Sequence, residues 1–191
     1  MTEAHLFAIG ILLAWLAGMR VYLTVFGVGI AGAFGWLDLP PALDVATSPW
    51  VLGTSGVLAV AEFLADKTPG VDSAWDLVHT LARVPAGAFL AAASLSPDGE
   101  LGAGMLATGA GVALASHVLK SGSRLLLNTS PEPVTNIGAS VTEDVAVVGA
   151  LALAFANPWI ALGLVVLVSL SIAGLVWWVW RRLFRRAPKP T

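Results

Sequence analysis

Residues 159–180 read WIALGLVVLVSLSIAGLVWWVW, and Arg181, Arg182, Arg185 and Arg186 follow almost at once. A helix needs about 20 mostly apolar residues to cross the hydrocarbon core of a bilayer. This stretch carries no charge, and tryptophans stand at both of its ends, where aromatic side chains meet the membrane interface. It therefore predicts a transmembrane helix whose basic end lies in the cytoplasm.

The composition extends this prediction to the whole chain. Of the 191 residues, 57% are hydrophobic and only 12% are charged, and the mean hydropathy is +0.84. Soluble domains carry about 25% charged residues, so lipid must be the solvent for most of this surface. The net charge is −2 and the bases concentrate in the tail, which argues against nucleic-acid binding. Cysteine is absent, which excludes disulfides and thiolate chemistry.

Six apolar segments are candidate spans. Glycine precedes Arg20 within the first, which is too long for one crossing and must tilt, extend or break there. Pro85 lies inside the third and predicts a kink. The sequence therefore predicts an all-α polytopic transmembrane bundle of about six spans, with one domain over residues 1–180 and a basic cytoplasmic tail over 181–191. The segments are 6–36, 50–64, 73–95, 101–119, 135–156 and 159–180.

Charge in the loops predicts how these spans are oriented. The loops at 38–50 and 96–100 carry acids and no base, whereas Lys67, Lys120 and the tail fall on the other side of a six-span alternation. Basic loops stay in the cytoplasm. We therefore expect a protein of the bacterial cytoplasmic (inner) membrane with both termini cytoplasmic.

A weak internal repeat is visible in two pairs of segments. GMRVYLT at 18–24 is similar to GSRLLLN at 122–128, and TSP at 47–49 precedes Glu62 as TSP at 129–131 precedes Glu143. An odd number of spans in each half would make the halves, 1–95 and 101–180, inverted repeats with broken or re-entrant helices, a design common in transporters. The alternative is chance similarity in a chain rich in Gly, Leu and Ala.

Charged residues inside these spans are the candidate functional site, because each costs at least about 2.5–3.5 kcal/mol at the bilayer centre unless it is paired or hydrated. Arg20 is either a structural ion pair with Glu62 or Glu143 or a clamp for an anionic group. Glu62 and Asp66, at spacing i, i+4, share one helical face and would suit a cation or a proton relay. Their alternative role is to pair with arginine and to mark a helix end.

Three further groups of polar residues have helical spacing. Asp76 and His79 belong to a stripe that is either a helix face at the membrane interface or the lining of an entrance. Two such groups are a weak metal signal, and the metal question stays open. In the second group, Lys120 and Arg124 are expected to extend to the interface as anchors, one turn beyond His117. The face of Asn136, Ser140, Glu143 and the adjacent Asp144 is too polar for lipid and must point into the bundle.

Three blocks of this chain form a recognisable set: GMRVYLTVF at 18–26, EFLADKTPGVDSAWD at 62–76 and GSRLLLNTSPEP at 122–133. Together they resemble the bacterial membrane family known as domain of unknown function 4126. The resemblance implies a multi-span membrane protein and supplies no activity. The middle block is also loosely similar to the motif of small cation exchangers built from inverted repeats, but the spacing of its two carboxylates differs and Ala65 replaces the glycine of that motif.

These observations favour a small secondary transporter or channel-like permease for a small ion or polar solute. The alternative is a scaffold or lipid-binding protein whose buried charges only pair with one another. An enzyme using His79 or His117 ranks below both, so we predict no catalytic residues and no cofactor. The expected partners are membrane lipids, a small ion or solute and a second copy of the chain, without nucleic acid. The predicted binding residues are Arg20, Glu62, Asp66, Asp76, His79, Arg124, Asn136, Glu143 and Asp144.

Overall fold

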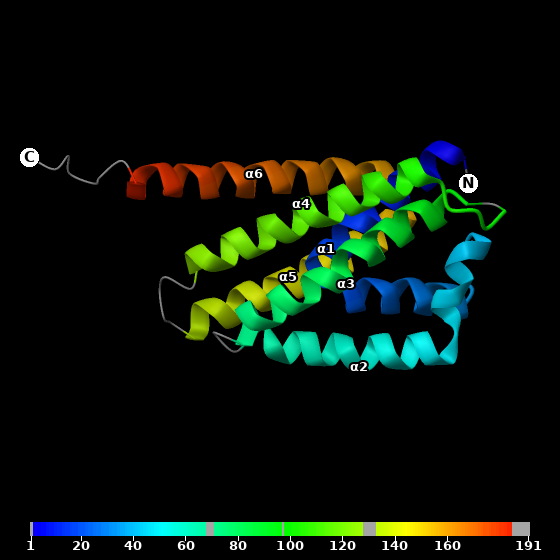
Figure 1. Ribbon diagram of the computed structural model, residues 1–191, viewed down its shortest axis with the longest axis horizontal. Helices are drawn as coiled ribbons and strands as arrows, with labels where there is room; N and C mark the ends of the chain where they lie inside the picture. Colours follow the sequence, from blue (N-terminus) through cyan, green and yellow to red (C-terminus); the bar gives the residue numbers. More distant parts are fainter. Residues whose placement is uncertain (1, 68–70, 97, 128–132, 185–191) are drawn as a thin grey trace, which may run out of the picture.

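The chain folds as a bundle of long helices in a computed structural model that describes residues 2–67, 71–96, 98–127 and 133–184 (Figure 1). The described residues contain no β-strand, which confirms the all-α class. In chain order the elements are α1 (Glu3–Ala33), the short 3-10 helix η1 (Pro41–Thr47), α2 (Pro49–Ala65), α3 (Val71–Ser94), α4 (Ala103–Leu127), α5 (Pro133–Ala156) and α6 (Pro158–Phe184).

Proline begins three of the helices. Pro49, Pro133 and Pro158 are the first residues of α2, α5 and α6. Proline suits this position because its fixed φ is helical and its missing N–H would have no partner within the helix. Ser48 then caps α2, since its side chain accepts a hydrogen bond of 3.3 Å from the Val51 N–H. These helix starts are therefore encoded locally. Pro85, by contrast, lies within α3, which continues through it as one helix to Ser94.

Arg20 interrupts α1, because its φ of −146° and ψ of 80° are not helical. The Thr24 hydroxyl donates a hydrogen bond of 2.8 Å to the Arg20 carbonyl oxygen beside the break. At this point the chain turns back, so both ends of α1 lie at the same end of the bundle (Figure 1). Leu6 and Ile9 of the first half accordingly line one cavity together with Val28 of the second half.

The two halves of α1 form a helical hairpin. They measure roughly 25 and 20 Å at 1.5 Å per residue, against a hydrocarbon core of about 30 Å. Of the three alternatives that the sequence left for this long segment, tilt, extension or a break, the structure shows the break, at Arg20. Among the described residues, four helices are long and apolar enough to cross a membrane, namely α1, α3, α5 and α6, or five with the pair η1 and α2, which is bent by 64°. The total length of α1 meets this test although its two halves fold back on each other. The predicted count of six, which took residues 6–36 as one full crossing, is not confirmed.

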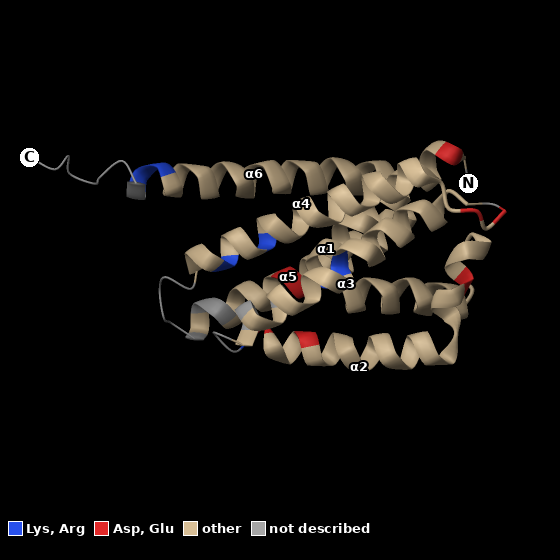
Figure 2. Cartoon of the chain, in the orientation of Figure 1, with Lys and Arg blue, Asp and Glu red and all other residues tan. Residues whose placement is uncertain are grey.

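The two ends of the bundle differ in charge (Figure 2). The end where α1 begins is acidic, and the opposite end, where α6 finishes with Arg181 and Arg182, is basic. Because α1 folds back, the start of α1 and the finish of α6 lie at opposite ends of the bundle (Figure 1). This arrangement does not fit the prediction that both termini are cytoplasmic. The acids at the first end come from the first turn of α1, from the loop before η1, from η1 itself and from the loop before α4: Glu3, Asp38, Asp44, Asp98 and Glu100.

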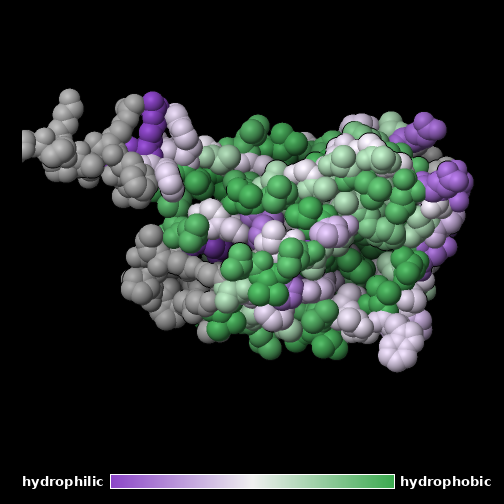
Figure 3. All heavy atoms as spheres, in the orientation of Figure 1, coloured by the Kyte–Doolittle hydropathy of each residue, from purple (hydrophilic) through white to green (hydrophobic). Residues whose placement is uncertain are grey.

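The hairpin of α1 is the centre of the bundle and contacts α2, α3, α4, α5 and α6. Its side chains Leu13, Leu16 and Ala17 are fully buried in the main apolar core. The outer surface is apolar as well, since exposed leucines, valines and tryptophans cover α6 and hydrophobic atoms dominate the visible face (Figure 3). An apolar surface of this kind fits a surrounding of lipid.

Gly18 lies against α4 just before the break in α1. A Cβ atom built on Gly18 would overlap the carbonyl oxygen of Ala113 and the hydroxyl of Ser116. Gly18→Ala is therefore expected to lower the free energy of unfolding by about 1–3 kcal/mol, the usual cost of overpacking. Denaturant titration of the purified protein measures this. Gly111→Ala is the matched control, because a Cβ there meets no atom within 4 Å, and equal effects of the two substitutions would contradict the packing argument.

Candidate functional site

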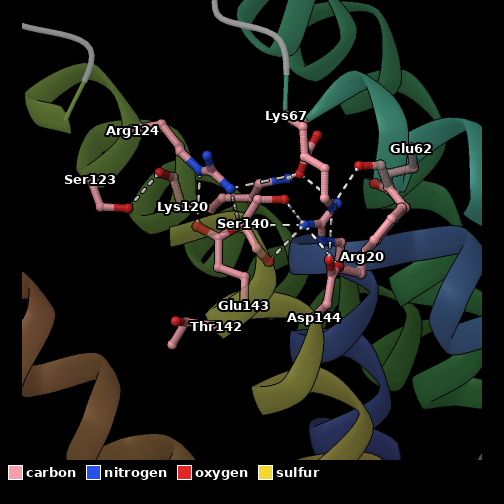
Figure 4. A network of polar contacts seen from close by, with 12 residues as sticks. Arg20, Glu62, Lys67, Lys120, Ser123, Arg124, Ser140, Thr142, Glu143 and Asp144 are labelled. Atoms are coloured by element: carbon pink, nitrogen blue, oxygen red, sulfur yellow. Dashed lines mark hydrogen bonds and ion pairs between the residues drawn. The ribbon is translucent and has the colours of Figure 1, made fainter. Parts of the chain in front are cut away.

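A network of charged side chains lies where the break in α1 meets the end of α2 and the middle of α5 (Figure 4). Arg20 stands at the break itself, and Asp66 is the residue that ends α2. Asp144 is close to the midpoint of α5, as Arg83 is of α3. The fold thus brings charges from five helices, α1 to α5, together well inside the bundle.

Arg20 binds carboxylates from two other helices and is 1% exposed. Its Nη1 lies 2.5 Å from Asp66 Oδ2, and its Nη2 lies 2.9 Å from Asp144 Oδ1. Glu143 is more distant, at 3.7 Å, and Nη2 also donates to the hydroxyl of Ser140 at 3.3 Å. The prediction that Arg20 pairs with an acidic residue of another segment is confirmed. Its closest partners are Asp66 and Asp144 rather than Glu62 and Glu143, the two that the sequence favoured. Glu143 is farther away, and Glu62 pairs with another base.

Asp66 pairs with basic side chains from two helices and is fully buried. Besides Arg20 of α1, Lys120 of α4 donates a hydrogen bond of 3.0 Å to the same oxygen, Oδ2. Arg124 reaches that oxygen at 3.9 Å. The expectation that Lys120 extends to the membrane interface is therefore wrong. Its ammonium is buried because the carboxylate at the end of α2 compensates the charge inside the bundle.

Two partly exposed pairs connect this network to the surface. Arg124 binds Glu143 through both carboxylate oxygens, with Nε at 3.0 Å and Nη2 at 2.8 Å. Lys67 lies 3.7 Å from Asp144, and the exposed fractions of Lys67, Glu143 and Asp144 are 20%, 15% and 16%. Burial lowers the pKa of the Lys67 ammonium from its usual value, while the charge of Asp144 opposes that shift.

Glu62 forms a separate buried pair with Arg83. Arg83 Nη2 donates a hydrogen bond of 2.7 Å to Glu62 Oε1, and both side chains are at most 1% exposed. Arg83 Nη1 also lies 2.9 Å from His117 Nδ1. Because a guanidinium can only donate, Nδ1 must accept, and the neutral imidazole then carries its proton on Nε2. That nitrogen faces the Thr80 hydroxyl at 2.7 Å.

The hydrogen bonding of these buried charges is incomplete. Glu62 Oε2, Asp66 Oδ1 and Arg20 Nε have no hydrogen-bond partner although they are buried. A partly satisfied buried network is costly, because the low dielectric that strengthens each bond also penalises each unpaired atom. Any water, proton or solute that satisfies these atoms therefore stabilises the site.

Comparison with known proteins places the chain in a family. The family model described as domain of unknown function 4126 matches residues 7–182. The chain belongs to that family. No curated protein and no solved structure matches it. The function of this family member must therefore be argued from its own network of charges.

The fold brings most of the predicted binding residues of this family member into the charged network. Arg20, Asp66, Arg124, Glu143 and Asp144 form one connected set of ion pairs, and the pair of Glu62 and Arg83 lies beside it.

His79 lies outside these ion pairs. Its ring stacks on Trp75 with centroids 4.1 Å apart and meets the edge of Tyr22 at 5.5 Å. The side chains of Asp76 and Asn136 lie outside the described part of the structure. Within that part, no group of three or more His, Asp or Glu side chains is arranged to hold a metal ion.

Three members of the site were not among the predicted binding residues: Lys67, Arg83 and Lys120. Each stood in a pattern that suggested a surface role, Lys67 at a helix end, Arg83 on a polar stripe and Lys120 beyond an apolar span. The signal for Arg83 was its spacing, because it follows His79 by four residues and so shares the helical face of Asp76 and His79. The sequence does not show which carboxylate faces a given base, so the burial of these three bases could be recognised only from the tertiary structure.

Proposed function

We propose that this chain is a small secondary transporter or channel-like permease for a small ion or polar solute, with its site at the charged network around Arg20. The observation that carries the proposal is the broken helix α1. Helices that end inside a membrane, with charges at the break, are typical of transporter sites, because irregular backbone at that depth requires protein or water around it. Here the second half of α1 begins beside three carboxylates, Asp66, Glu143 and Asp144.

Two features of the network support movement of a solute through it. Its inner members are fully buried, whereas Lys67, Glu143 and Asp144 keep 15–20% of their surface exposed. Hydrophilic atoms are also visible between apolar side chains near the C-terminal half of α4 (Figure 3). The network therefore extends from the surface into the centre of the bundle.

The inverted repeat enters this proposal as a prediction. The directions of the helices support it, since α2 runs opposite to α5 and α3 runs opposite to α6 (Figure 1). The ion pairs do not follow the two halves, because Glu62 pairs with Arg83 while Glu143 pairs with Arg124.

The proposed orientation puts the chain in the bacterial cytoplasmic membrane with its C-terminus in the cytoplasm and its N-terminus outside. The basic end of α6 and the acidic loops at the other end of the bundle support this, because basic segments stay in the cytoplasm. Reporter fusions that are active on one side of the membrane only, placed before Thr2 and after Thr191, should report opposite compartments. Reports from the same compartment would contradict the hairpin of α1.

One observation favours the alternative, a scaffold or lipid-binding bundle. Every charged side chain described in the network has a partner of opposite charge within 4.0 Å. Charges that only pair with one another hold helices together and need no solute.

Flux measurements on purified protein in liposomes separate the two functions. Sodium, potassium, formate, nitrate and protons are offered in turn, with protein-free liposomes as the baseline. The transporter proposal predicts flux of one class, most of which is lost in Asp144→Asn while the variant still assembles. Arg182→Gln, at the exposed end of α6, is the matched control and should transport normally. The scaffold predicts no flux of any class from protein of normal thermal stability.

A further inference from the structure

One carboxylate oxygen, Oδ2 of Asp66, is the meeting point of three cations. Arg20 Nη1 lies 2.5 Å from it, Lys120 Nζ lies 3.0 Å from it, and Arg124 Nη2 lies 3.9 Å from it. Asp66, Arg20 and Lys120 are at most 1% exposed, and Arg124 is 2% exposed. Two of these bases come from α4 and one from the break in α1. We call Arg20, Lys120 and Arg124 the cationic cradle.

We propose that the cationic cradle is the binding site of a small oxyanion, such as a monocarboxylate, and that the Asp66 carboxylate occupies this site when no anion is bound. This inference rests on the proposed transport function and assigns its substrate class. The entering anion takes the place of Asp66 Oδ2 between Arg20 and Lys120. Asp66 then moves away with the end of α2.

Electrostatics favours an anion over a cation in this position. A cation bound near Asp66 Oδ2 would meet three positive groups within 4 Å of that oxygen, and at low dielectric this repulsion is large. Lys67 supports the same conclusion. Burial lowers the pKa of its ammonium, and a bound anion nearby would offset the cost of keeping that ammonium charged.

The place of Asp66 in the fold allows the exchange. It is the residue that ends α2, and α2 packs mainly against the second half of α1 at the edge of the bundle (Figure 1). One of its oxygens, Oδ1, has no hydrogen-bond partner, so the carboxylate is held by Oδ2 alone. The cradle residues, by contrast, lie on the central helices α1 and α4. The ligand that best replaces a carboxylate is another small planar oxyanion with the same charge.

Chemical rescue of Asp66→Ala tests the proposal. Thermal unfolding of the purified variant is followed in detergent while formate, acetate or nitrate is titrated at constant ionic strength. The variant should gain stability with each oxyanion and should not distinguish sodium, potassium and choline as counter-ions. Half-saturation should come at a concentration at least about tenfold lower than in the wild type, because the internal competitor occupies the site for most of the time there. No response to the anion, or a response to the cation, would overturn the proposal.

A second substitution shows whether the anion binds in the cradle. Asp66→Ala combined with Lys120→Met should lose the response, while Asp66→Ala combined with Arg182→Met should keep it. If Asp66→Ala fails to assemble with every salt tested, the same titration of the wild type tests the proposal. Its weaker stabilisation by formate should then disappear in Lys120→Met, and persistence of an equal response in that variant would overturn the proposal.

Formate uptake into liposomes separates this inference from the proposed function. Anion-specific stabilisation together with formate flux supports both. Stabilisation without any flux keeps the cradle as a binding site and removes the transport function. Flux of a cation, without stabilisation of Asp66→Ala by anions, keeps the transporter and overturns the anion site.

Discussion

Arg20→Gln is expected to lower the free energy of unfolding by about 3–5 kcal/mol, the cost of breaking a buried ion pair by removing one partner. The substitution removes the guanidinium that binds Asp66 at 2.5 Å and Asp144 at 2.9 Å. Lys120 still pairs with Asp66, but Asp144 keeps only Lys67, at 3.7 Å. Glutamine is also too short to bridge α2 and α5 across the break in α1.

Reversible unfolding in mixed micelles measures this loss. Arg20→Gln combined with Asp144→Asn should recover part of it, because the second substitution removes the carboxylate left without its closest partner. Arg182→Gln is the matched control at an exposed position and should leave stability unchanged. A loss below about 1 kcal/mol, the range of exposed ion pairs, would show that water reaches Arg20 freely.

Glu62→Gln is expected to cost a similar amount, about 3–5 kcal/mol, because it removes the negative charge that binds Arg83 at 2.7 Å inside the bundle. The two side chains are joined by one hydrogen bond of 2.7 Å and are almost completely buried. Glutamine keeps an oxygen that can accept from Arg83 but supplies no charge. The measurement is the same unfolding assay, applied to Glu62→Gln, Arg83→Gln and the double variant.

The identity of the partner makes this prediction specific. The double variant of Glu62 and Arg83 should be more stable than the sum of the single losses implies, with a coupling energy of about 1–3 kcal/mol. Glu62→Gln combined with Arg20→Gln should be nearly additive, since Glu62 binds Arg83 whereas Arg20 binds Asp66 and Asp144. Coupling to Arg20 rather than to Arg83 would contradict this pairing.

Several features of the site follow from the sequence because they depend on local chemistry. An arginine inside an apolar run requires a carboxylate, and glycine at 18 with a polar residue at 20 marks a weak point in a helix too long for one crossing. Prolines at 49, 133 and 158 specify where helices begin. The spacing of Ser140 and Glu143 predicts a face that points into the bundle, and Ser140 is fully buried there.

The choice of partners does not follow from the sequence in the same way. Glu62 and Asp66 lie on one face of α2, yet Glu62 meets Arg83 of α3 while Asp66 meets Arg20 and Lys120. The difference arises because one helical turn separates them along α2, and the break in α1 at Arg20 lies beside Asp66 rather than beside Glu62. Spacing predicts that two residues share a face but does not predict which helix stands opposite each turn.

The sequence by itself therefore indicated that lipid surrounds most of this protein, and it indicated the helical class and the family, domain of unknown function 4126. It also identified charged residues that need partners of opposite charge inside the bundle. The tertiary structure decided that α1 turns back at Arg20, and that turn places the start of α1 and the finish of α6 at opposite ends of the bundle. Hydropathy measures the length of an apolar run and is the same for a crossing and for a hairpin. Only the packing of the two halves against α3, α4 and η1 distinguishes them.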